Sequence, residues 1–224
     1  MSRKNIITVE RAEVEFRLKS GIKELGILLD DIQLGKLVDF LFLLGKWNST
    51  YNLTAIRDIY SMLTYHLLDS LSIAACLSTC ENILDVGSGA GLPGLVLATV
   101  YPDKRVSMID VVQKKTAFIN QVRIELGLDN VTVYSDRVEK LSVEDKFDAI
   151  ISRAFSSLSD FVGLACHLLK ENGKFYAMKG LIPFDEIGNL DSGWKVSRIQ
   201  PLKVPQLDAQ RHLIIIESAG TTVD

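Results

Sequence analysis

Residues 82–94 read Asn-Ile-Leu-Asp-Val-Gly-Ser-Gly-Ala-Gly-Leu-Pro-Gly, and this stretch decides the fold. A short apolar run leads to Asp85 and Val86, glycines follow at 87, 89, 91 and 94, and a second apolar run covers 95–100. The pattern predicts a buried strand, a tight turn and a helix. Glycine lets a ligand approach the main chain, and the positive end of the helix dipole points at the turn. The stretch therefore indicates a seat for a nucleotide-like cofactor.

Beyond about residue 80 the sequence alternates between strand and helix patterns. Such alternation predicts a parallel sheet with helices on both faces and right-handed connections. A loop alone separates the last two strand patterns, which predicts an antiparallel pair at one edge. The expected strands are 82–86, 105–110, 131–135, 147–152, 173–179, 194–204 and 211–218, and the expected helices are 92–101, 113–126, 157–170 and 183–190.

The first part of the chain has a helical pattern instead. Apolar residues recur every three or four positions within 10–29 and 33–47, residues 48–58 are polar and irregular, and 59–77 return to helix. The length of 224 residues fits one large domain with a small appendage. We therefore predict an N-terminal helical cap at 1–78 and a cofactor-binding domain at 79–224 that forms one compact unit.

Bulk composition argues against several classes of protein. Hydrophobic residues make up 47% of the chain, yet no apolar run approaches the roughly 20 residues that span a bilayer. The N-terminus lacks a secretory signal pattern. A net charge of −3 argues against a strongly basic nucleic-acid module but allows a local basic face. We expect a cytoplasmic protein with no membrane contact, and a monomer, because nothing in the sequence indicates an obligate interface.

Cysteine and histidine positions indicate neither disulfides nor a metal site. The three cysteines, Cys76, Cys80 and Cys166, are odd in number and lack metal-ligand spacing. Free thiols in a reducing compartment are the better interpretation. The three histidines form no HExxH-type pattern, so we predict that no metal is bound.

Acidic residues around the turn distinguish between cofactors. Residues 89–94 satisfy G-x-G-x-x-G, which alone suggests NAD or FAD. Asp85 favours S-adenosyl-L-methionine, because a carboxylate at the mouth of the strand suits the methionine ammonium group and is poorly placed beside a pyrophosphate. Asp110 ends the second strand and can accept hydrogen bonds from ribose hydroxyls, as either cofactor requires. Residues 135–139 follow the third strand with polar groups and one apolar group that can hold an adenine.

Several words of the sequence, taken in order, resemble the glucose-inhibited division protein B family. The resemblance covers most of the chain, from about residue 35 to 217. The words are Trp47-Asn48, Tyr51-Asn52-Leu53-Thr54, His66-Leu67-Leu68-Asp69-Ser70, Asp85 to Gly94, Ser152-Arg153-Ala154-Phe155, Tyr176-Ala177-Met178-Lys179-Gly180 and Arg211-His212-Leu213.

The resemblance implies both a fold and an activity. The fold is the Rossmann-like α/β fold of class I methyltransferases, with a mostly parallel seven-stranded sheet and one antiparallel edge strand. The activity is that of a bacterial enzyme that uses S-adenosyl-L-methionine to methylate N7 of one guanine in small-subunit (16S) ribosomal RNA. The implied partner is that RNA or the small ribosomal subunit, in the cytoplasm.

The candidate site combines the resemblance with the residue pattern. Matching positions imply cofactor contacts at Gly87, Leu92, Val138, Glu139 and Arg153, and the pattern adds Asp85, Gly89, Gly91, Asp110 and Asp136. The expected catalytic residues are the cations Arg153, Arg137 and Lys179. Contacts with RNA are expected from Asn52, Thr54, Lys114, Lys115, Arg211 and His212. His66 and Asp69 lie three residues apart, and we expect them to form a buried structural pair.

The chemistry expected at this site needs no general base. Guanine N7 has a free lone pair, so no proton leaves when it attacks the methyl group. The fourth strand ends in Ser152-Arg153-Ala154 and lacks the Asn-Pro-Pro-aromatic ending of amino-group methyltransferases. Catalysis would then consist of aligning N7 with the methyl–sulfur bond and excluding water.

Three other interpretations fit part of the pattern. A class I methyltransferase acting on a small metabolite or a protein would share every cofactor feature. A nicotinamide-dependent oxidoreductase would bind NAD in place of S-adenosyl-L-methionine. A ribosome-assembly factor without enzymatic activity would keep the fold alone.

Overall fold

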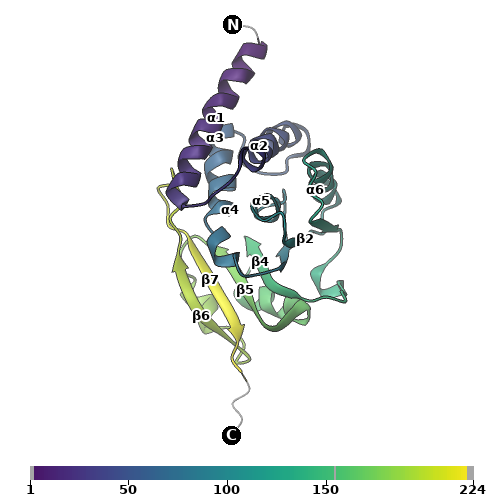
Figure 1. The fold of residues 1–224 in the computed structure, drawn as a ribbon. Helices are drawn as coiled ribbons and strands as arrows, with labels where there is room; N and C mark the ends of the chain where they lie inside the picture. The colour runs from purple at the N-terminus through teal and green to yellow at the C-terminus, as the bar shows by residue number, and fades with distance from the viewer. Residues whose placement is uncertain (1–2, 154, 221–224) are drawn as a thin grey trace.

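A seven-stranded sheet in the order β3-β2-β1-β4-β5-β7-β6 forms the centre of the protein (Figure 1). The computed structural model describes residues 3–153 and 155–220, and side chains from residue 10 onward. Strand β7 runs antiparallel to both β5 and β6, and the other neighbours are parallel. The predicted sheet with one reversed strand is confirmed, and β6 lies outside β7 at the edge. The strands are β1 (Asn82–Val86), β2 (Arg105–Ile109), β3 (Val131–Tyr134), β4 (Phe147–Arg153), β5 (Leu169–Lys179), β6 (Trp194–Pro201) and β7 (His212–Ser218).

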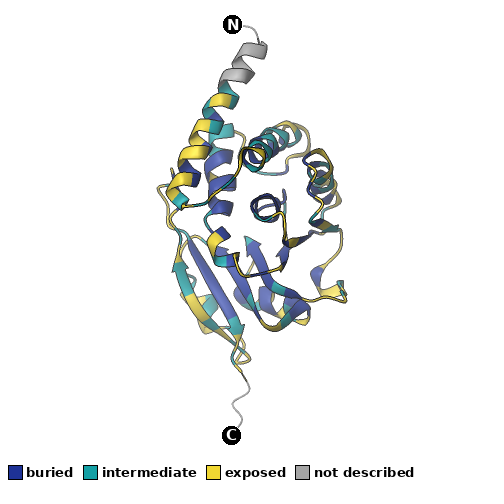
Figure 2. Ribbon diagram, in the orientation of Figure 1, coloured by how far each residue is buried: buried dark blue, intermediate teal, exposed yellow. Residues whose placement is uncertain are grey.

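Helices cover both faces of the sheet. Successive residues of a strand point to opposite faces, so Ala149 and Ile151 of β4 join one apolar cluster and Ile150 joins the other. Helices α5 (Gly94–Val100) and α6 (Gln113–Glu125) pack on the first face, and α7 (Leu158–Ala165) and α8 (Phe184–Gly188) pack on the second. The strands between these layers are largely buried (Figure 2).

The N-terminal helices pack on the same face as α5. These are α1 (Arg3–Leu25), α2 (Asp31–Tyr51), α3 (Ile59–Met62) and α4 (Asp69–Leu71), with a π-helical turn at Leu63–Leu68 and a 3₁₀ turn at Ala74–Leu77. Buried leucines of this region, such as Leu37 and Leu67, belong to the same apolar cluster as Ile83 of β1. The helical cap and the sheet therefore share one core.

Local capping moves the start of α2 ahead of the predicted residue, Gln33. The Asp30 carboxylate accepts a hydrogen bond from the Gln33 N–H at 2.7 Å, and the Gln33 side chain accepts one from the Asp30 N–H at 3.0 Å. This capping box begins the helix at Asp31. Gly26, with φ of 68°, ends α1 just before it.

Residues 48–58 are only partly irregular, because α2 continues to Tyr51. The Asn48 side chain is buried although it is polar, and it binds the segment that follows the helix. Its amide donates to the Ile56 carbonyl at 2.9 Å and accepts from the Thr54 N–H at 2.8 Å. The polar residues that predicted a loop from position 48 therefore hold that loop against the helix.

The predicted single helix at 59–77 is interrupted by the π-helical turn. His66 and Asp69 are both buried, as predicted, but each has a partner of its own. His66 Nε2 lies 2.9 Å from the Thr54 hydroxyl, whereas the Asp69 carboxylate accepts from two arginines. Within the described ranges, no helix is long and apolar enough to cross a membrane.

Candidate functional site

The glycine turn joins β1 to α5 at the edge where the parallel strands end. The Gly87 and Ser88 N–H groups donate to the Ile109 carbonyl at 2.9 and 3.2 Å. The Gly89 N–H donates to the Asp110 carboxylate at 2.9 Å, and Gly89 has φ of 59°. That angle lies in the left-handed region, where a side chain causes strain. The turn is therefore fixed to the end of β2 before any ligand binds.

Asp85 lies beneath the turn and is fully buried. Its Oδ2 accepts a hydrogen bond from the Gly94 N–H at 2.8 Å. A Cβ atom at Gly94 would lie 2.6 Å from the Met108 side chain and 2.9 Å from the carboxylate, so only glycine fits there. The first N–H of α5 is thus bonded to Asp85. The helix begins at Gly94, two positions after the predicted start at residue 92.

The second carboxylate oxygen of Asp85 has no hydrogen-bond partner in the described part of the chain. Burial raises the pKa of Asp85 to about 7, although the Gly94 N–H and the charge of Arg153 act in the opposite direction. A buried acceptor without a donor costs free energy. An ammonium group of a ligand would supply both the missing donor and the missing positive charge. The residues present therefore fit the methionine end of S-adenosyl-L-methionine.

A cavity of about 450 Å³ opens beside the turn, where β1, β2 and β3 end. Asp110 is held in its wall, because its Oδ1 accepts from the Val112 N–H at 2.9 Å and Lys115 Nζ lies 3.6 Å from its Oδ2. Five predicted cofactor residues and two predicted cations line the cavity, namely Gly87, Asp110, Asp136, Val138, Glu139, Lys115 and Arg137.

The walls of this cavity also contain residues that sequence reasoning missed. Val111, Val112, Phe155 and Leu164 supply apolar surface that could contact a flat ring. Phe155 stands in one of the words of the resemblance, and Val111 directly follows Asp110, so their positions were available as signals. Leu164 lies on α7, and nothing in its local sequence marks it. Ala154, part of the same word as Phe155, lies outside the described residues.

Two arginines meet at one buried carboxylate near the turn. Arg153 ends β4 and donates from Nη1 to the Tyr65 carbonyl at 3.0 Å and to Asp69 Oδ2 at 3.4 Å. Arg211 precedes β7 and donates from Nε to Asp69 Oδ1 at 3.0 Å. Asp69 is 3% exposed. The structure thus brings a predicted catalytic residue and a predicted RNA contact together on a residue of the cap.

Comparison with known proteins identifies the family. The family model for rRNA small subunit methyltransferase G (GidB) matches residues 33–214. The chain belongs to this family. A relative from Janthinobacterium sp. (strain Marseille), named ribosomal RNA small subunit methyltransferase G, is 49% identical over 93% of this chain and 96% of its own. A relative of the same name from Herminiimonas arsenicoxydans is 52% identical, over 89% and 94% respectively.

Solved structures agree on the fold of this GidB family chain. A SAM-dependent methyltransferase from Aquifex aeolicus aligns with a TM-score of 0.55 and 22% identity, over 70% of this chain and 92% of that one. A 1,6-didemethyltoxoflavin-N1-methyltransferase from Burkholderia thailandensis, solved with S-adenosylhomocysteine, aligns with a TM-score of 0.57 and 15% identity, over 81% and 90%. The predicted class I methyltransferase fold is confirmed.

The other two cations predicted to act near the chemistry have acidic partners elsewhere. Lys179 Nζ donates to both oxygens of Glu186 at 3.0 and 2.8 Å, and Glu186 also accepts from the Leu158 N–H. This ion pair joins β5 to α8. Arg137 is exposed and lies 3.3 Å from the Glu139 carboxylate at the rim of the cavity. Neither side chain joins the Arg153 cluster, and their roles in the GidB family chain stay predictions.

The residues predicted to contact RNA lie in two groups. Asn52 follows α2 and Lys114 lies in the first turn of α6; both are exposed, and Lys114 Nζ donates to the Tyr51 carbonyl at 2.8 Å. His212 is buried, and its Nδ1 lies 2.7 Å from the Gly180 carbonyl. Thr54 is bonded to His66, and burial lowers the pKa of His66 to about 4, with the charge of Arg153 acting in the same direction. Thr54 and His212 thus have structural bonds, while Asn52 and Lys114 have outward positions.

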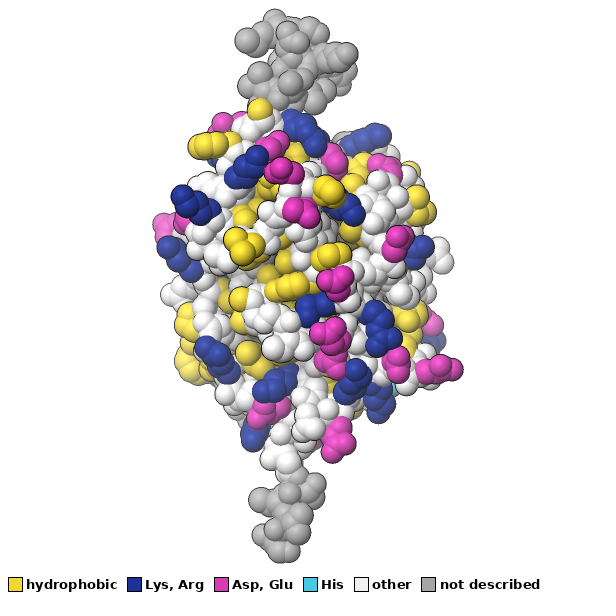
Figure 3. Space-filling view, viewed as in Figure 1, with side chains coloured by type: hydrophobic (Ala, Val, Ile, Leu, Met, Phe, Trp, Pro, Cys, Tyr) yellow, Lys and Arg dark blue, Asp and Glu magenta, His cyan; other side chains and the backbone are white. Residues whose placement is uncertain are grey.

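Charge is mixed on the face of the molecule seen in Figure 3, where basic and acidic side chains alternate.

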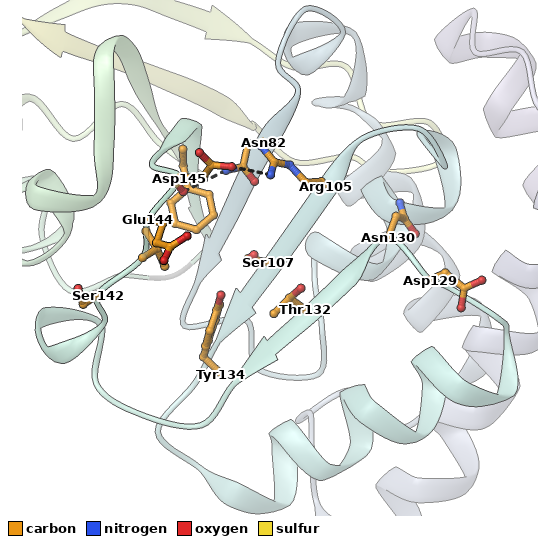
Figure 4. Close-up of a pocket in the computed structure, with 12 residues that line it drawn as sticks. Asn82, Arg105, Ser107, Asp129, Asn130, Thr132, Tyr134, Ser142, Glu144 and Asp145 are labelled. Carbon is orange, nitrogen blue, oxygen red and sulfur yellow. Dashed lines mark hydrogen bonds and ion pairs between the residues drawn. The ribbon is translucent and has the colours of Figure 1, made fainter.

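A second cavity, of about 460 Å³, lies where strands β1, β2 and β4 begin. Figure 4 shows Tyr134, Thr132 and Ser107 along the sheet in this cavity, and Arg105 paired with Asp145 at 2.9 Å. Ligands of open α/β sheets bind at the opposite edge, where strands end, so the cavity beside the glycine turn is the candidate cofactor site.

The described residues contain no group of three or more His, Cys, Asp or Glu side chains that could hold a metal ion.

Leu92 and Gly91 complete the glycine turn. Leu92 is 2% exposed and does not line the cavity, so its contact with the cofactor stays a prediction.

Proposed function

We propose that this chain transfers a methyl group from S-adenosyl-L-methionine to N7 of a guanine in small-subunit (16S) ribosomal RNA. The observation that carries the proposal is the buried, unpartnered Asp85 oxygen beneath a pre-formed glycine turn, beside a cavity whose wall holds Asp110. Membership of the rRNA small subunit methyltransferase G family supports the choice of RNA as substrate. The choice of guanine N7 rests on the resemblance, and methylation at N7 requires no general base.

In this proposal each part of the site has a distinct task. Asp85 binds the ammonium group, Asp110 accepts from the ribose hydroxyls, and residues 136–139 with Val111 and Phe155 enclose the adenine. The cofactor supplies a sulfonium-bound methyl group, which is the electrophile. Arg153 and Arg211 orient the incoming guanosine through its phosphate or its O6 and N7 edge. Holding N7 in line with the electrophile provides the catalytic effect.

Proton transfer has no place in this mechanism. Guanine N7 attacks through a lone pair and loses no proton. Burial and the charge of Arg153 lower the pKa of His66, which keeps it neutral at physiological pH while it is hydrogen-bonded to Thr54. We therefore assign His66 to the support of the loop at 52–58 and not to general base catalysis.

The same proposal includes the setting of the protein. We propose a cytoplasmic monomer in which residues 1–78 cap the domain at 79–224 and shape the surface that meets the ribosomal subunit. Methylation of deproteinised RNA, of an assembly intermediate and of the mature subunit can be compared directly with one labelled cofactor.

The decisive experiment maps N7-methylguanine in 16S RNA from cells with and without this chain. We expect one guanine to lose its modification when the chain is absent and to regain it when the wild-type chain is restored. Asp85→Ala should not restore it, because the ammonium group loses its partner. Restoration by Asp85→Ala would point to an assembly factor without enzymatic activity.

Calorimetry separates the remaining alternatives. Binding of S-adenosyl-L-methionine without binding of NAD is expected, and the reverse would indicate an oxidoreductase. Transfer of labelled methyl to a metabolite or protein, with none to RNA, would contradict the proposed substrate.

A further inference from the structure

We propose that Asp69 is a positioning residue, which aligns the guanidinium groups of Arg153 and Arg211 with the substrate side of the cofactor site. The inference rests on the proposed function, because it names how that site holds its RNA substrate. Asp69 touches neither substrate nor cofactor in this scheme and acts only through the two arginines.

The carboxylate is placed so that each oxygen serves a different arginine. Oδ1 accepts from Arg211 Nε at 3.0 Å and Oδ2 lies 3.4 Å from Arg153 Nη1. The Asp69 side chain is 5% exposed, whereas those of Arg153 and Arg211 are 24% and 23% exposed. The acid is thus enclosed while both cations keep part of their surface open to a ligand.

Hydrogen bonds to the main chain of Asp69 hold this residue in place. The Asp69 N–H donates to the Thr64 and His66 carbonyls as the π-helical turn ends, and the Asp69 carbonyl accepts from the Ser72 hydroxyl at 2.6 Å. π-Helical turns are rare and occur frequently at functional sites. Here the turn directly precedes Asp69, which contacts both arginines.

Three segments far apart in the sequence meet at this point. Asp69 belongs to the cap, Arg153 ends β4 and Arg211 precedes β7, at sequence separations of 84 and 142 residues from Asp69. Strand β4 runs parallel to β1 with Ile151 opposite Asp85, so Arg153, two residues further along, lies at the edge of the sheet where the glycine turn begins. Contacts from Arg153 Nη1 to the Tyr65 carbonyl and from Arg211 Nη1 to the Gln210 carbonyl hold the two groups further.

Electrostatics explains why an acid is needed between these cations. Two guanidinium groups brought to one place repel each other, and one carboxylate between them offsets that repulsion. Among the described residues, the cluster keeps a net positive charge and guanidinium donors without a partner, which suits a phosphate or the O6 and N7 edge of guanine. A role in stability alone is a weaker explanation, because buried ion pairs often contribute little net stability.

The test compares Asp69→Asn with the wild type on small subunits or 16S RNA that lack the modification. Asparagine keeps the shape of the side chain but replaces the carboxylate with a neutral amide. The NH2 group of that amide is a donor and would face one of the arginines. We expect kcat/KM for RNA to fall by about 10- to 100-fold through misplacement of the arginines. Arg211→Ala should then cost much less in the Asp69→Asn background than in the wild type, because the two changes remove the same alignment.

Asp148→Asn is the matched control. Asp148 also joins distant segments, accepting from Lys170 and from the Glu81 and Asn82 N–H groups where β1 begins. Its loss should lower the melting temperature while kcat/KM stays within about twofold. If Asp69→Asn does not fold by circular dichroism, Arg211→Lys replaces it, since lysine keeps the charge but loses the fixed fork of donors.

The outcomes separate the inference from the proposed function. Transfer by the wild type with independent, multiplicative losses in the double variant would overturn the inference alone. So would a loss in Asp69→Asn no greater than its unfolded fraction, or full activity in Arg211→Lys. Absence of methyl transfer to RNA by the wild type would overturn the proposed function and this inference with it.

Discussion

Asp85 controls a pH dependence that can be measured at the scale of a single residue. Burial raises its pKa to about 7, from the 3.8 of an exposed carboxyl. Above pH 4 the unfolded chain releases this proton while the folded chain keeps it. The free energy of unfolding, relative to Asp85→Asn, should therefore fall between pH 4 and 7 by on the order of 4 kcal/mol and then level off. Urea unfolding of both proteins across that range tests the prediction.

Cofactor affinity should change in the opposite sense, because an ammonium group needs the charged carboxylate. Between pH 6 and 8 the charged fraction of Asp85 rises about tenfold, and the affinity for S-adenosyl-L-methionine should rise with it. The cofactor's own amine also titrates near pH 8, so the comparison is again with Asp85→Asn. Equal pH profiles for the two proteins would contradict the assignment.

The sequence predicted correctly which residues lie together where the signals are local, while their contacts with the cofactor stay predictions. Asp85, the glycines and Asp110 lie within one strand-turn-helix-strand unit, so their meeting follows from the order of the chain. The partners of Asp69 could not be predicted in the same way. They come from β4 and from the segment before β7, and no local pattern encodes which distant cation faces a buried acid.

At the scale of elements, Asn48 decides how α2 and the following loop fit together. Asn48 is 3% exposed, and its side-chain amide forms hydrogen bonds with both Thr54 and Ile56. Asn48→Ala leaves the half-buried Thr54 N–H and Ile56 carbonyl without these bonds, at up to about 1–3 kcal/mol for each group. We expect a fall in the urea midpoint with an unchanged m-value, measured by circular dichroism.

Asn120→Ala provides the comparison for Asn48→Ala. Within the part of the chain that the structure describes, the half-buried Asn120 amide donates to the Thr116 carbonyl of its own helix and to nothing else, so its removal should cost less than about 1 kcal/mol. Equal losses for the two variants would show that the Asn48 bonds contribute nothing beyond an amide bonded within its own helix.

Element types were predictable because the apolar spacing differs between the two parts of the chain. The boundaries were not, because side-chain bonds to the main chain set them. The capping box of Asp30 and Gln33 starts α2, and Asn48 keeps the helix intact where polar residues indicated a loop. The π-helical turn at Leu63–Leu68 was not predictable either, because its apolar spacing resembles that of an ordinary helix.

At the scale of the whole molecule, one apolar cluster runs from the cap into the sheet. Leu67 of the cap is fully buried in it, together with Ile83 of β1 and Val96 of α5. The predicted boundary near residue 78 therefore divides the sequence, but the apolar core continues across it. We expect the cap and the sheet to unfold together, in a single cooperative transition.

The two tryptophans allow this cooperativity to be measured, because Trp47 lies on α2 and Trp194 begins β6. Trp194→Phe leaves a probe of the cap, and Trp47→Phe leaves a probe of the sheet edge. Within each protein, the fluorescence midpoint in urea should coincide with the circular dichroism midpoint. Leu67→Ala should lower the free energy of unfolding by about 2–5 kcal/mol, as expected for a buried leucine. Fluorescence and circular dichroism should report the same loss. Separate midpoints, or a shift seen only by Trp47, would mean that the cap folds independently of the cofactor-binding domain.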